Sequence, residues 1–379
     1  MSGEGAIPAG AITLGAAETF TIWRTGKVVG VSLAEPHDVL STSSVNGGSR
    51  SGLRHLVNEQ MCEGTGDDRA HAKLTELGVS GYHDAVCASL GLDPAEVALM
   101  GTAAQMQYVA IERSSFREIT VTAVVTAGVA TNAATAGDPG PWYEEPEDFS
   151  NVAGTINTIL VSNIGLSSGA LARSVGLLTE AKTAALNELA VPSKSSDRLA
   201  TGTGTDQFCV AAPAHGARRL QWAGHHTKLG ELIGVSVRNA TLEAVRWQNG
   251  LEPSLTRNLF HALGRHGFTD PQLTDAVVGL LDDAGGRLFA ANVESIVNDP
   301  QVAASAYAVA TLLDRRRAGT LSADSADEAI LNQCALLAVA VSNRPDVFAV
   351  ARAELESALR DVARQVPAAI AIGWRLKWT

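Results

Sequence analysis

The sequence has few aromatic residues and no excess of positive charge. Phe, Trp and Tyr make up 5% of the 379 residues, and 29 Lys and Arg stand against 40 Asp and Glu, a formal net charge of −11 at pH 7. A negative chain repels phosphate backbones and anionic lipid surfaces, and scarce aromatics leave little surface for base stacking. We therefore expect neither a nucleic-acid partner nor a membrane partner.

Cysteine is also scarce, and targeting signals are missing. The four cysteines, Cys62, Cys87, Cys209 and Cys334, form no CxxC pair, a usage typical of a reducing cytoplasm. The first 15 residues lack the basic and apolar segments of a signal peptide. The most apolar later run, ILNQCALLAVAVSN, is too short to span a bilayer. We expect a soluble, cytoplasmic protein.

Apolar residues, at 46% of the chain, suffice for a large core. The pattern predicts strands at 118–126, 154–163 and 207–212 and helices at 69–91 and 168–190. TFTIWRT and KVVGVSL, divided by Gly26, predict a hairpin. Strands alternating with helices indicate an α/β layered fold, with a mixed β-sheet core packed with helices.

The character of the chain changes after about residue 227, where strand patterns end. Asp270-Pro271 and Asp299-Pro300 each predict a helix N-cap followed by proline at the first helical position. We therefore expect two domains, an α/β core at 1–239 and an all-helical extension at 240–379. The extension can be a lid over the site, an oligomer contact or a fused partner-binding module, and a homo-oligomer is compatible with it.

The stretch LATGTGTDQFCV, residues 199–210, places alternating threonine and glycine before a predicted strand. Glycine lets a ligand approach the backbone, and threonine adds a donor and an acceptor at each step. One interpretation is a loop that holds a polar group, with Asp206 as a fixed negative charge. The other is a tight strand entry in which Asp206 accepts bonds from local amides.

GLSSG, residues 165–169, matches the GxSxG motif between a predicted strand and a predicted helix. This is the context of a nucleophile elbow, which would make Ser167 a nucleophile. No HGGG-like oxyanion segment precedes it. The alternative is that Ser167 is the N-cap of the helix.

Two further stretches carry ionisable groups. Glu180 and Lys182 lie on a predicted helix, two residues apart, so they do not face the same way. Small apolar neighbours favour an inward direction for at least one of them. His225 and His226 precede another helical stretch without an HExxH motif, and the sequence predicts no metal site. His226 is either a general acid or base, or a capping or exposed histidine.

Several runs of this chain, taken together and in their order along the sequence, resemble the adenosylcobinamide amidohydrolase family of corrinoid salvage. The resemblance covers roughly residues 25–235. The matching runs are LSTSSVNGG (40–48), HLVNEQ (55–60), VALMGTAAQM (97–106), VTAGVATNAATAGDP (125–139), GTINTIL (154–160), TEAKTAALNEL (179–189), ATGTGTDQ (200–207) and HTKLGELIG (226–234). Each run alone is modest, whereas the ordered set is specific.

The resemblance implies hydrolysis of the amide that joins an aminopropanol arm to the corrin ring, giving adenosylcobyric acid. The candidate catalytic residues are Asp206, His226, Glu180 and Lys182. The candidate substrate-binding residues are Asn46, Asn132, Asn157, Thr201, Gly202, Thr203, Gly204 and Thr205. Asp206 or His226 would position water and Lys182 would stabilise negative charge, or a threonine of 201–205 would act as nucleophile.

The resemblance also implies that cobalt enters with the corrinoid substrate and that the protein supplies no cofactor. The base-off cobalamin-binding pattern DxHxxG is absent. Three alternatives stay open. They are an amidase for a different substrate, a corrinoid-binding protein without turnover, and a serine hydrolase built on Ser167.

Overall fold

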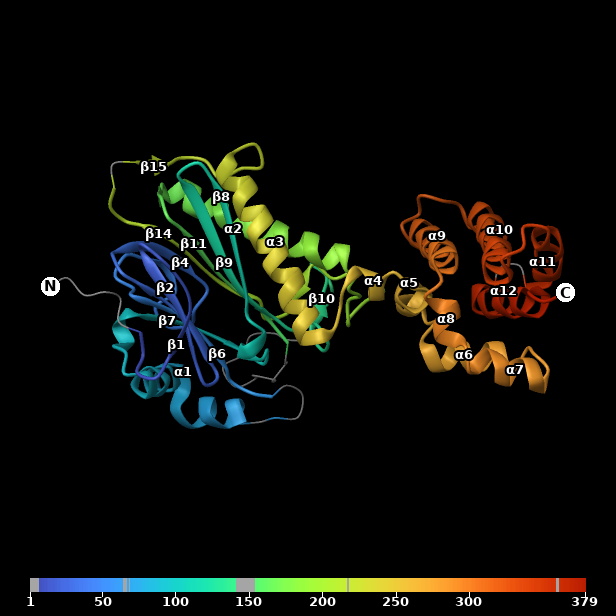
Figure 1. Cartoon of the computed structure of the whole chain (residues 1–379), viewed down its shortest axis with the longest axis horizontal. Coiled ribbons are helices and arrows are strands. Elements are labelled where there is room, and N and C mark those ends of the chain that lie inside the picture. Colours follow the sequence, from blue (N-terminus) through green and yellow to red (C-terminus); the bar gives the residue numbers. More distant parts are fainter. Residues whose placement is uncertain (1–6, 64–66, 68, 141–153, 217, 359–360) are drawn as a thin grey trace. The chain divides into compact units, whose positions relative to one another are not determined.

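The computed structural model describes residues 7–63, 67, 69–140, 154–216, 218–358 and 361–379 (Figure 1). The chain divides into two compact units, Met1–Glu252 and Pro253–Thr379. The boundary expected after residue 239 falls inside helix α3 (Lys228–Asn249). This helix packs on the sheet of the first unit and ends where Gly250 adopts a left-handed φ of 66°. The α/β unit therefore extends beyond α3.

A six-stranded mixed sheet forms the centre of the first unit. Its order is β5 (Gly48–Arg50), β4 (His37–Ser41), β14 (Gln207–Pro213), β11 (Ile156–Ser162), β9 (Ile119–Ala127) and β8 (Ala110–Phe116). Strands β11 and β14 are parallel, with Asn157 opposite Gln207, and the other neighbours are antiparallel. The three strands predicted from valine- and threonine-rich runs are β9, β11 and β14, so these predictions are confirmed.

A second sheet of five strands packs face to face on the first. Its order is β1 (Ile12–Ala17), β2 (Phe20–Thr25), β3 (Val28–Leu33), β6 (His55–Gln60) and β7 (Val97–Thr102). The predicted hairpin is confirmed as β2–β3, with Gly26 at a φ of 52° in its turn. One hydrophobic core, which includes Ile22, Val31 and Ile159, fills the space between the two sheets.

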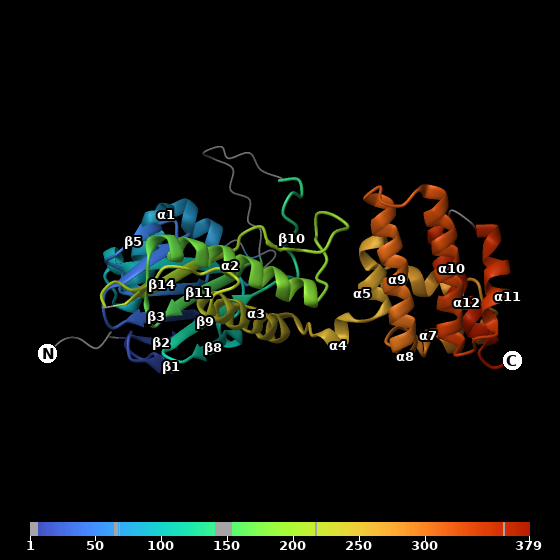
Figure 2. The same ribbon diagram turned by 90° about the horizontal axis from the view of Figure 1, so that it is seen from above.

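Helices cover the outer face of each sheet (Figure 1 and Figure 2). Helices α2 (Ser168–Glu188) and α3 share a core with the six-stranded sheet, and α1 (Arg69–Leu90) contributes Cys87 to a core with Trp23 and Val57 of the five-stranded sheet. The first unit is thus a four-layer sandwich of helix, sheet, sheet and helix. The helices predicted at 69–91 and 168–190 are confirmed as α1 and α2.

Short elements complete the first unit. They are η1 (Pro94–Glu96), η2 (Met106–Tyr108), β10 (Ala133–Ala134), β12 (Gly165–Leu166), β13 (Gly202–Thr203) and β15 (Arg219–Leu220). Strand β10 pairs with β13, and β12 pairs with β15. The first of these pairs fastens the threonine–glycine loop to the segment that follows β9.

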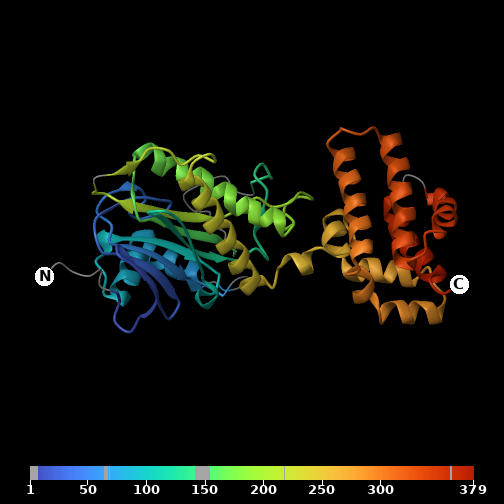
Figure 3. The ribbon, with the colours of Figure 1, turned by 45° about the horizontal axis from the view of Figure 1, so that its top comes forward.

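The second unit consists of helices wherever it is described, which confirms the all-helical prediction (Figure 3). They are α4 (Pro253–Thr256), α5 (Leu259–Leu263), η3 (Gly264–His266), α6 (Asp270–Val278), α7 (Asp283–Ala290), α8 (Val293–Val297), α9 (Pro300–Arg317), α10 (Ala323–Ser342), α11 (Val347–Leu355), η4 (Glu356–Ala358) and α12 (Val362–Leu376). Helix α10 packs against α9 and α12 around a core of its own. A Cβ on Gly373 of α12 would lie 2.4 Å from the Ala338 carbonyl oxygen of α10, so glycine permits this close packing.

The predicted caps of this unit have different outcomes. Asp299 is the N-cap of α9 and accepts bonds from the amides of Gln301 and Val302, as expected. For α6 the prediction is wrong by one residue, because Thr269 holds the extended N-cap conformation and Asp270 already lies in the first turn. Among the described residues, no helix is both long and apolar enough to cross a membrane.

Candidate active site

The threonine–glycine loop lies where the parallel strands β11 and β14 begin. Asp206 directly precedes β14, and its Oδ1 accepts the backbone N–H of Ile156, the first residue of β11, at 3.0 Å. Two parallel strands start at the same edge of a sheet, so a carboxylate before one strand reaches the first amide of the other. The Ile156 amide lies 50 residues away in the sequence, so this bond is a tertiary contact. The local amide that Asp206 accepts, as the second interpretation expected, is that of Thr203.

Asp206 accepts three further hydrogen bonds. Its Oδ2 accepts the Lys182 ammonium and the Thr203 N–H, the latter at 3.0 Å, and its Oδ1 accepts the Thr203 hydroxyl at 2.6 Å. A carboxylate offers about four lone-pair positions, and these donors occupy all of them. The side chains of Lys182 and Asp206 are 10% and 18% exposed, so this ion pair is largely shielded from water.

Helix α2 delivers Lys182 from its buried face, where Leu178, Ala181 and Ala185 pack into the core. Its aliphatic stem runs along this apolar surface and its ammonium reaches the polar sheet edge. Gly202 makes room for it, because a Cβ there would lie 2.5 Å from Asp206 Oδ2 and 2.7 Å from Lys182 Nζ. This glycine is needed for the close approach of the ion pair.

A second polar group adjoins the first. Asn132 Nδ2 donates to the Gly154 carbonyl oxygen at 2.8 Å and to Thr205 Oγ1 at 3.1 Å, and Thr205 Oγ1 also contacts Thr155 Oγ1 at 2.5 Å. The Gly204 N–H, which sequence reasoning left open to a ligand, donates to the Asn132 carbonyl oxygen at 3.2 Å. Asn132 and Thr205 thus hold the loop in place.

Asn157 lies between the two sheets and is 1% exposed. Its Nδ2 donates to Asn58 Oδ1 at 2.7 Å and to the Gly101 carbonyl oxygen at 3.0 Å, while the Gly101 N–H donates to Gln207 Oε1 at 3.0 Å. These bonds connect β11, β6, β7 and β14. Asn157 Oδ1 is buried and has no hydrogen-bond partner among the described residues, which marks a place for a small donor such as a buried water.

A pocket of about 520 Å³ opens beside Asp206. Its wall combines polar and apolar groups from the loop at 42–45, α1, β7 and the start of β14. The lining residues are Thr42, Ser44, Val45, Met61, Leu74, Val79, Tyr82, His83, Leu99, Gly101, Thr205, Asp206 and Gln207. A mainly apolar cavity with a few convergent polar groups is the form that small-molecule sites take.

Sequence reasoning missed the contribution of α1 to this pocket. The Tyr82 hydroxyl donates to Glu59 Oε2 at 3.0 Å, and burial raises the pKa of the Glu59 carboxyl and of the Tyr82 hydroxyl. His83 is 2% exposed, and its Nε2 lies 3.2 Å from the Val97 carbonyl oxygen. Tyr82 and His83 occupy an ordinary helical pattern, so only the packing of α1 on the second sheet shows that they face a cavity.

Three other candidates have structural partners. Asn46 adopts a φ of 58° and its Nδ2 donates to the carbonyl oxygens of Pro94 and Val97 at 2.8 Å, which anchors the loop that lines the pocket. Thr201 Oγ1 accepts the Ala136 N–H at 2.9 Å. Ser167 Oγ accepts the Ala170 N–H at 3.1 Å as the N-cap of α2, so the capping interpretation of GLSSG is confirmed.

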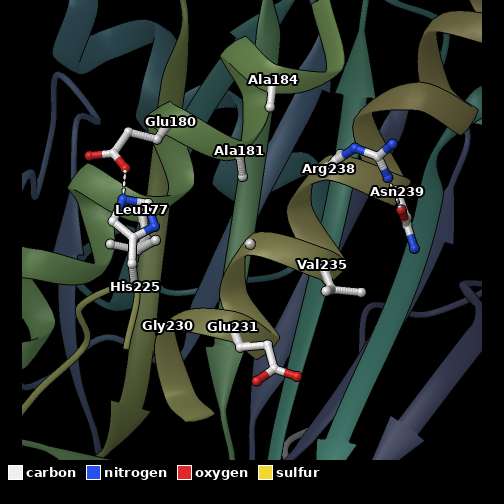
Figure 4. Close-up of a pocket in the computed structure, with 11 residues that line it drawn as sticks. Leu177, Glu180, Ala181, Ala184, His225, Gly230, Glu231, Val235, Arg238 and Asn239 are labelled. Atoms are coloured by element: carbon white, nitrogen blue, oxygen red, sulfur yellow. Dashed lines mark hydrogen bonds and ion pairs between the residues drawn. The ribbon is translucent and has the colours of Figure 1, made fainter. Parts of the chain in front are cut away.

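Glu180 and the adjacent histidines lie elsewhere. Glu180 Oε2 pairs with His225 Nε2 at 2.5 Å, and both side chains line a separate pocket of about 430 Å³ between the outer faces of α2 and α3 (Figure 4). His226 is exposed and makes no hydrogen bond or ion pair with Lys182 or Asp206 in the described structure. Of the four candidate catalytic residues, the structure brings together Lys182 and Asp206.

These observations define a class of protein: an α/β sandwich with a charged, hydroxyl-bearing cluster at the edge of a small-molecule pocket. No group of three or more His, Cys, Asp or Glu side chains gathers into a metal-binding arrangement within the described ranges. The model of the adenosylcobinamide amidohydrolase family (CbiZ) matches residues 13–253, and the chain belongs to this family, as its sequence motifs led us to expect.

A curated relative is an uncharacterized protein of Methanocaldococcus jannaschii. It is 35% identical over 184 residues, which cover 45% of this chain and 71% of the relative. The family match ends at residue 253, within one residue of the end of the first structural unit at Glu252. The α/β unit is thus the part that the family shares, and the helical unit lies outside the matched range.

Proposed function

We propose that this chain hydrolyses the amide between the aminopropanol arm and the corrin ring of adenosylcobinamide. Water adds across the C–N bond, so that the ring side chain becomes the carboxyl group of adenosylcobyric acid and aminopropanol leaves as an amine. Membership of the family supports the proposal. The observation that carries it is the cluster of Lys182, Asp206 and Thr203, in which Asp206 lines the 520 Å³ pocket.

Amide hydrolysis needs a nucleophile, a proton for the leaving amine and stabilisation of the tetrahedral oxyanion. The Lys182 ammonium supplies positive charge next to the pocket, while Asp206 holds that charge and the threonine loop in one geometry. Apolar groups such as Leu74 and Val79 suit the methyl-bearing edge of a corrin, and Gln207 and Thr205 suit its amide groups. Cobalt arrives as part of this substrate.

The test is a turnover assay of the purified full-length chain with adenosylcobinamide, in which mass spectrometry follows adenosylcobyric acid and aminopropanol. We expect both products in equal amounts. We also expect Asp206→Asn to lower kcat about 1,000-fold, because it removes the charge that holds Lys182.

Two outcomes contradict the proposal. Unchanged substrate together with tight binding, seen as a shift of the corrinoid absorbance, would indicate a binding protein without turnover. Neither turnover nor binding would indicate an amidase for a different substrate.

A further inference from the structure

The loop at 201–206 carries three threonine hydroxyls, and their surroundings differ. Thr201 Oγ1 accepts a backbone N–H, and Thr205 Oγ1 shares its bonds with Asn132, Thr155 and the Gly154 carbonyl. Thr203 Oγ1 accepts the Thr205 N–H at 3.4 Å and donates its own proton to the Asp206 carboxylate at 2.6 Å. Within this loop, Thr203 is the hydroxyl whose proton already points at a base.

The hydrogen bonds of Asp206 exclude the simplest alternative, in which Asp206 itself activates a water molecule for attack on the amide. A carboxylate that activates a free water needs an open lone pair, and the four donors to Asp206 leave none. Three of these donors are the backbone amides of Ile156 and Thr203 and the Lys182 ammonium. The fourth, the Thr203 hydroxyl, becomes a nucleophile when it loses its proton.

We infer that Thr203 is the nucleophile of this site and that the reaction proceeds through an ester on its Oγ1. The inference rests on the proposed function. Thr203 is half-buried and does not itself line the pocket, but the Asp206 carboxylate that its hydroxyl contacts does. Gly202 and Gly204 on either side leave its backbone free of bulky neighbours.

The steps balance without a cofactor. Thr203 Oγ1 attacks the carbonyl carbon of the amide while its proton passes to Asp206 Oδ1 along the existing hydrogen bond. The C–N bond breaks, Asp206 returns the proton to the departing amine, and an ester joins Thr203 to the corrin side chain. The esterified Thr203 no longer donates to Asp206, so Oδ1 is open to a water. This water gives a proton to Oδ1 as it attacks the ester, the acid is released, and the proton returns to Thr203 Oγ1. The ion pair with Lys182 holds Asp206 in place between the steps.

A second hydroxyl–carboxylate pair in the chain provides a matched control. Ser193 Oγ donates to Asp138 Oδ2 at 2.6 Å, the same distance as in the Thr203–Asp206 pair. Ser193 and Asp138 belong to a separate hydrogen-bond group, in which Asp138 Oδ2 also accepts the Thr135 N–H at 2.8 Å. Ser193→Ala therefore removes an equivalent hydrogen bond away from the proposed nucleophile.

The experiment compares wild type, Thr203→Ala, Thr203→Ser and Ser193→Ala as full-length chains with adenosylcobinamide. We expect Thr203→Ala to lose about 1,000-fold or more in kcat with little change in KM, and Thr203→Ser to stay within about 10-fold of wild type. Ser193→Ala should keep wild-type turnover. Acid-quenched wild type should show the mass of an adenosylcobyryl ester on the peptide that contains Thr203.

A β-lactone probe, which acylates activated hydroxyls, separates this inference from the proposed function. If wild type does not hydrolyse adenosylcobinamide but the lactone acylates Thr203, the proposed substrate is wrong, whereas the assignment of Thr203 as the nucleophile is supported. If wild type is active and folded Thr203→Ala keeps its kcat within about 10-fold, the inference is overturned and the proposed function stands. Absence of lactone labelling in an inactive wild type would overturn both.

Discussion

Lys182 and Glu180 lie two residues apart on helix α2, yet they belong to two different places in the molecule. The Lys182 side chain is 10% exposed and pairs with Asp206 at the sheet edge, whereas that of Glu180 is 46% exposed and pairs with His225 on the outer surface. Residues two apart on an α-helix are separated by about 200° around its axis. Charges that are neighbours in sequence therefore need not share a site.

The exposure of each ion pair to water determines how much the pair contributes to stability. A shielded pair with full hydrogen bonding leaves an uncompensated charge when one partner is lost, whereas an exposed pair contributes little. We therefore expect the Lys182 site to control activity and the Glu180 site, in the groove between α2 and α3, to tolerate substitution.

The largest expected effect follows from neutralising one member of each pair. Lys182→Met should lower kcat about 1,000-fold, because Asp206 loses the cation that holds it, and should lower the free energy of unfolding by about 2 kcal/mol. Glu180→Gln is the matched control, with an expected change in stability below about 0.5 kcal/mol. Steady-state kinetics and urea unfolding measure both. A stronger loss of turnover in the Glu180 variant would reverse the comparison.

Two glycines, one beside the Lys182–Asp206 pair and one in the outer groove, test the same difference between the two places. Gly202→Ala places a Cβ 2.5 Å from Asp206 Oδ2, so the ion pair must move, and we expect turnover to fall about 100-fold. Gly234 of α3 lines the outer groove, and a Cβ there would meet no atom within 4 Å. Gly234→Ala should leave turnover unchanged and stabilise the protein by about 0.5–1 kcal/mol, because alanine favours a helix. Equal effects of the two substitutions would contradict this assignment.

The buried histidine His55 makes the stability of the folded chain depend on pH. His55 is 8% exposed, its Nδ1 lies 2.9 Å from Ser32 Oγ, and burial lowers its pKa from 6.5 to about 4. In the unfolded chain His55 is protonated below about pH 6.5, whereas in the folded chain it is protonated only below about pH 4. The free energy of unfolding therefore falls as the pH drops between these values. His55 alone should cost about 2 kcal/mol at pH 5 relative to pH 8.

Unfolding by urea at pH 8 and pH 5 measures this cost. His55→Gln should reduce the pH dependence by that amount. A His55 variant with the full wild-type dependence would show that another group is responsible.

The smallest effect concerns the helical unit. Both places on α2 lie within residues 1–252, and each unit has its own hydrophobic core. A fragment of residues 1–252 should therefore fold, with an unfolding midpoint within about 4 °C of that of the corresponding transition in the full chain. Calorimetry checks this, and an insoluble or unfolded fragment would show that the α/β unit depends on residues 253–379.

Much of the fold could be predicted because strong local patterns decide it. The valine-rich runs that became β9 and β11 are buried on both faces, and a residue that cannot face water must lie in the interior wherever the strand pairs. The cap at Asp299 involves atoms within three residues and needed no tertiary information. The domain boundary expected after residue 239 falls inside α3, because the amphipathic pattern of this helix continues to Asn249.

The candidate site was harder to predict, because its members come from separate elements. The motif at 201–206 was recognisable as a polar loop, but only the parallel pairing of β11 with β14 brings Asp206 to the Ile156 amide. Tyr82 and His83 had no sequence signal of a pocket, because their role depends on which face of α1 meets the second sheet.

The sequence by itself determined the family, the alternation of strands and helices, the helical character of residues 253–379 and the chemistry available in the loop. Tertiary structure alone decided which charges meet. Lys182 reaches Asp206 because a helix and a sheet pack at one edge, and Glu180 is excluded because the same helix turns it toward solvent. The physical reason is that residue order encodes local conformation, whereas the distance between side chains far apart in sequence follows from packing.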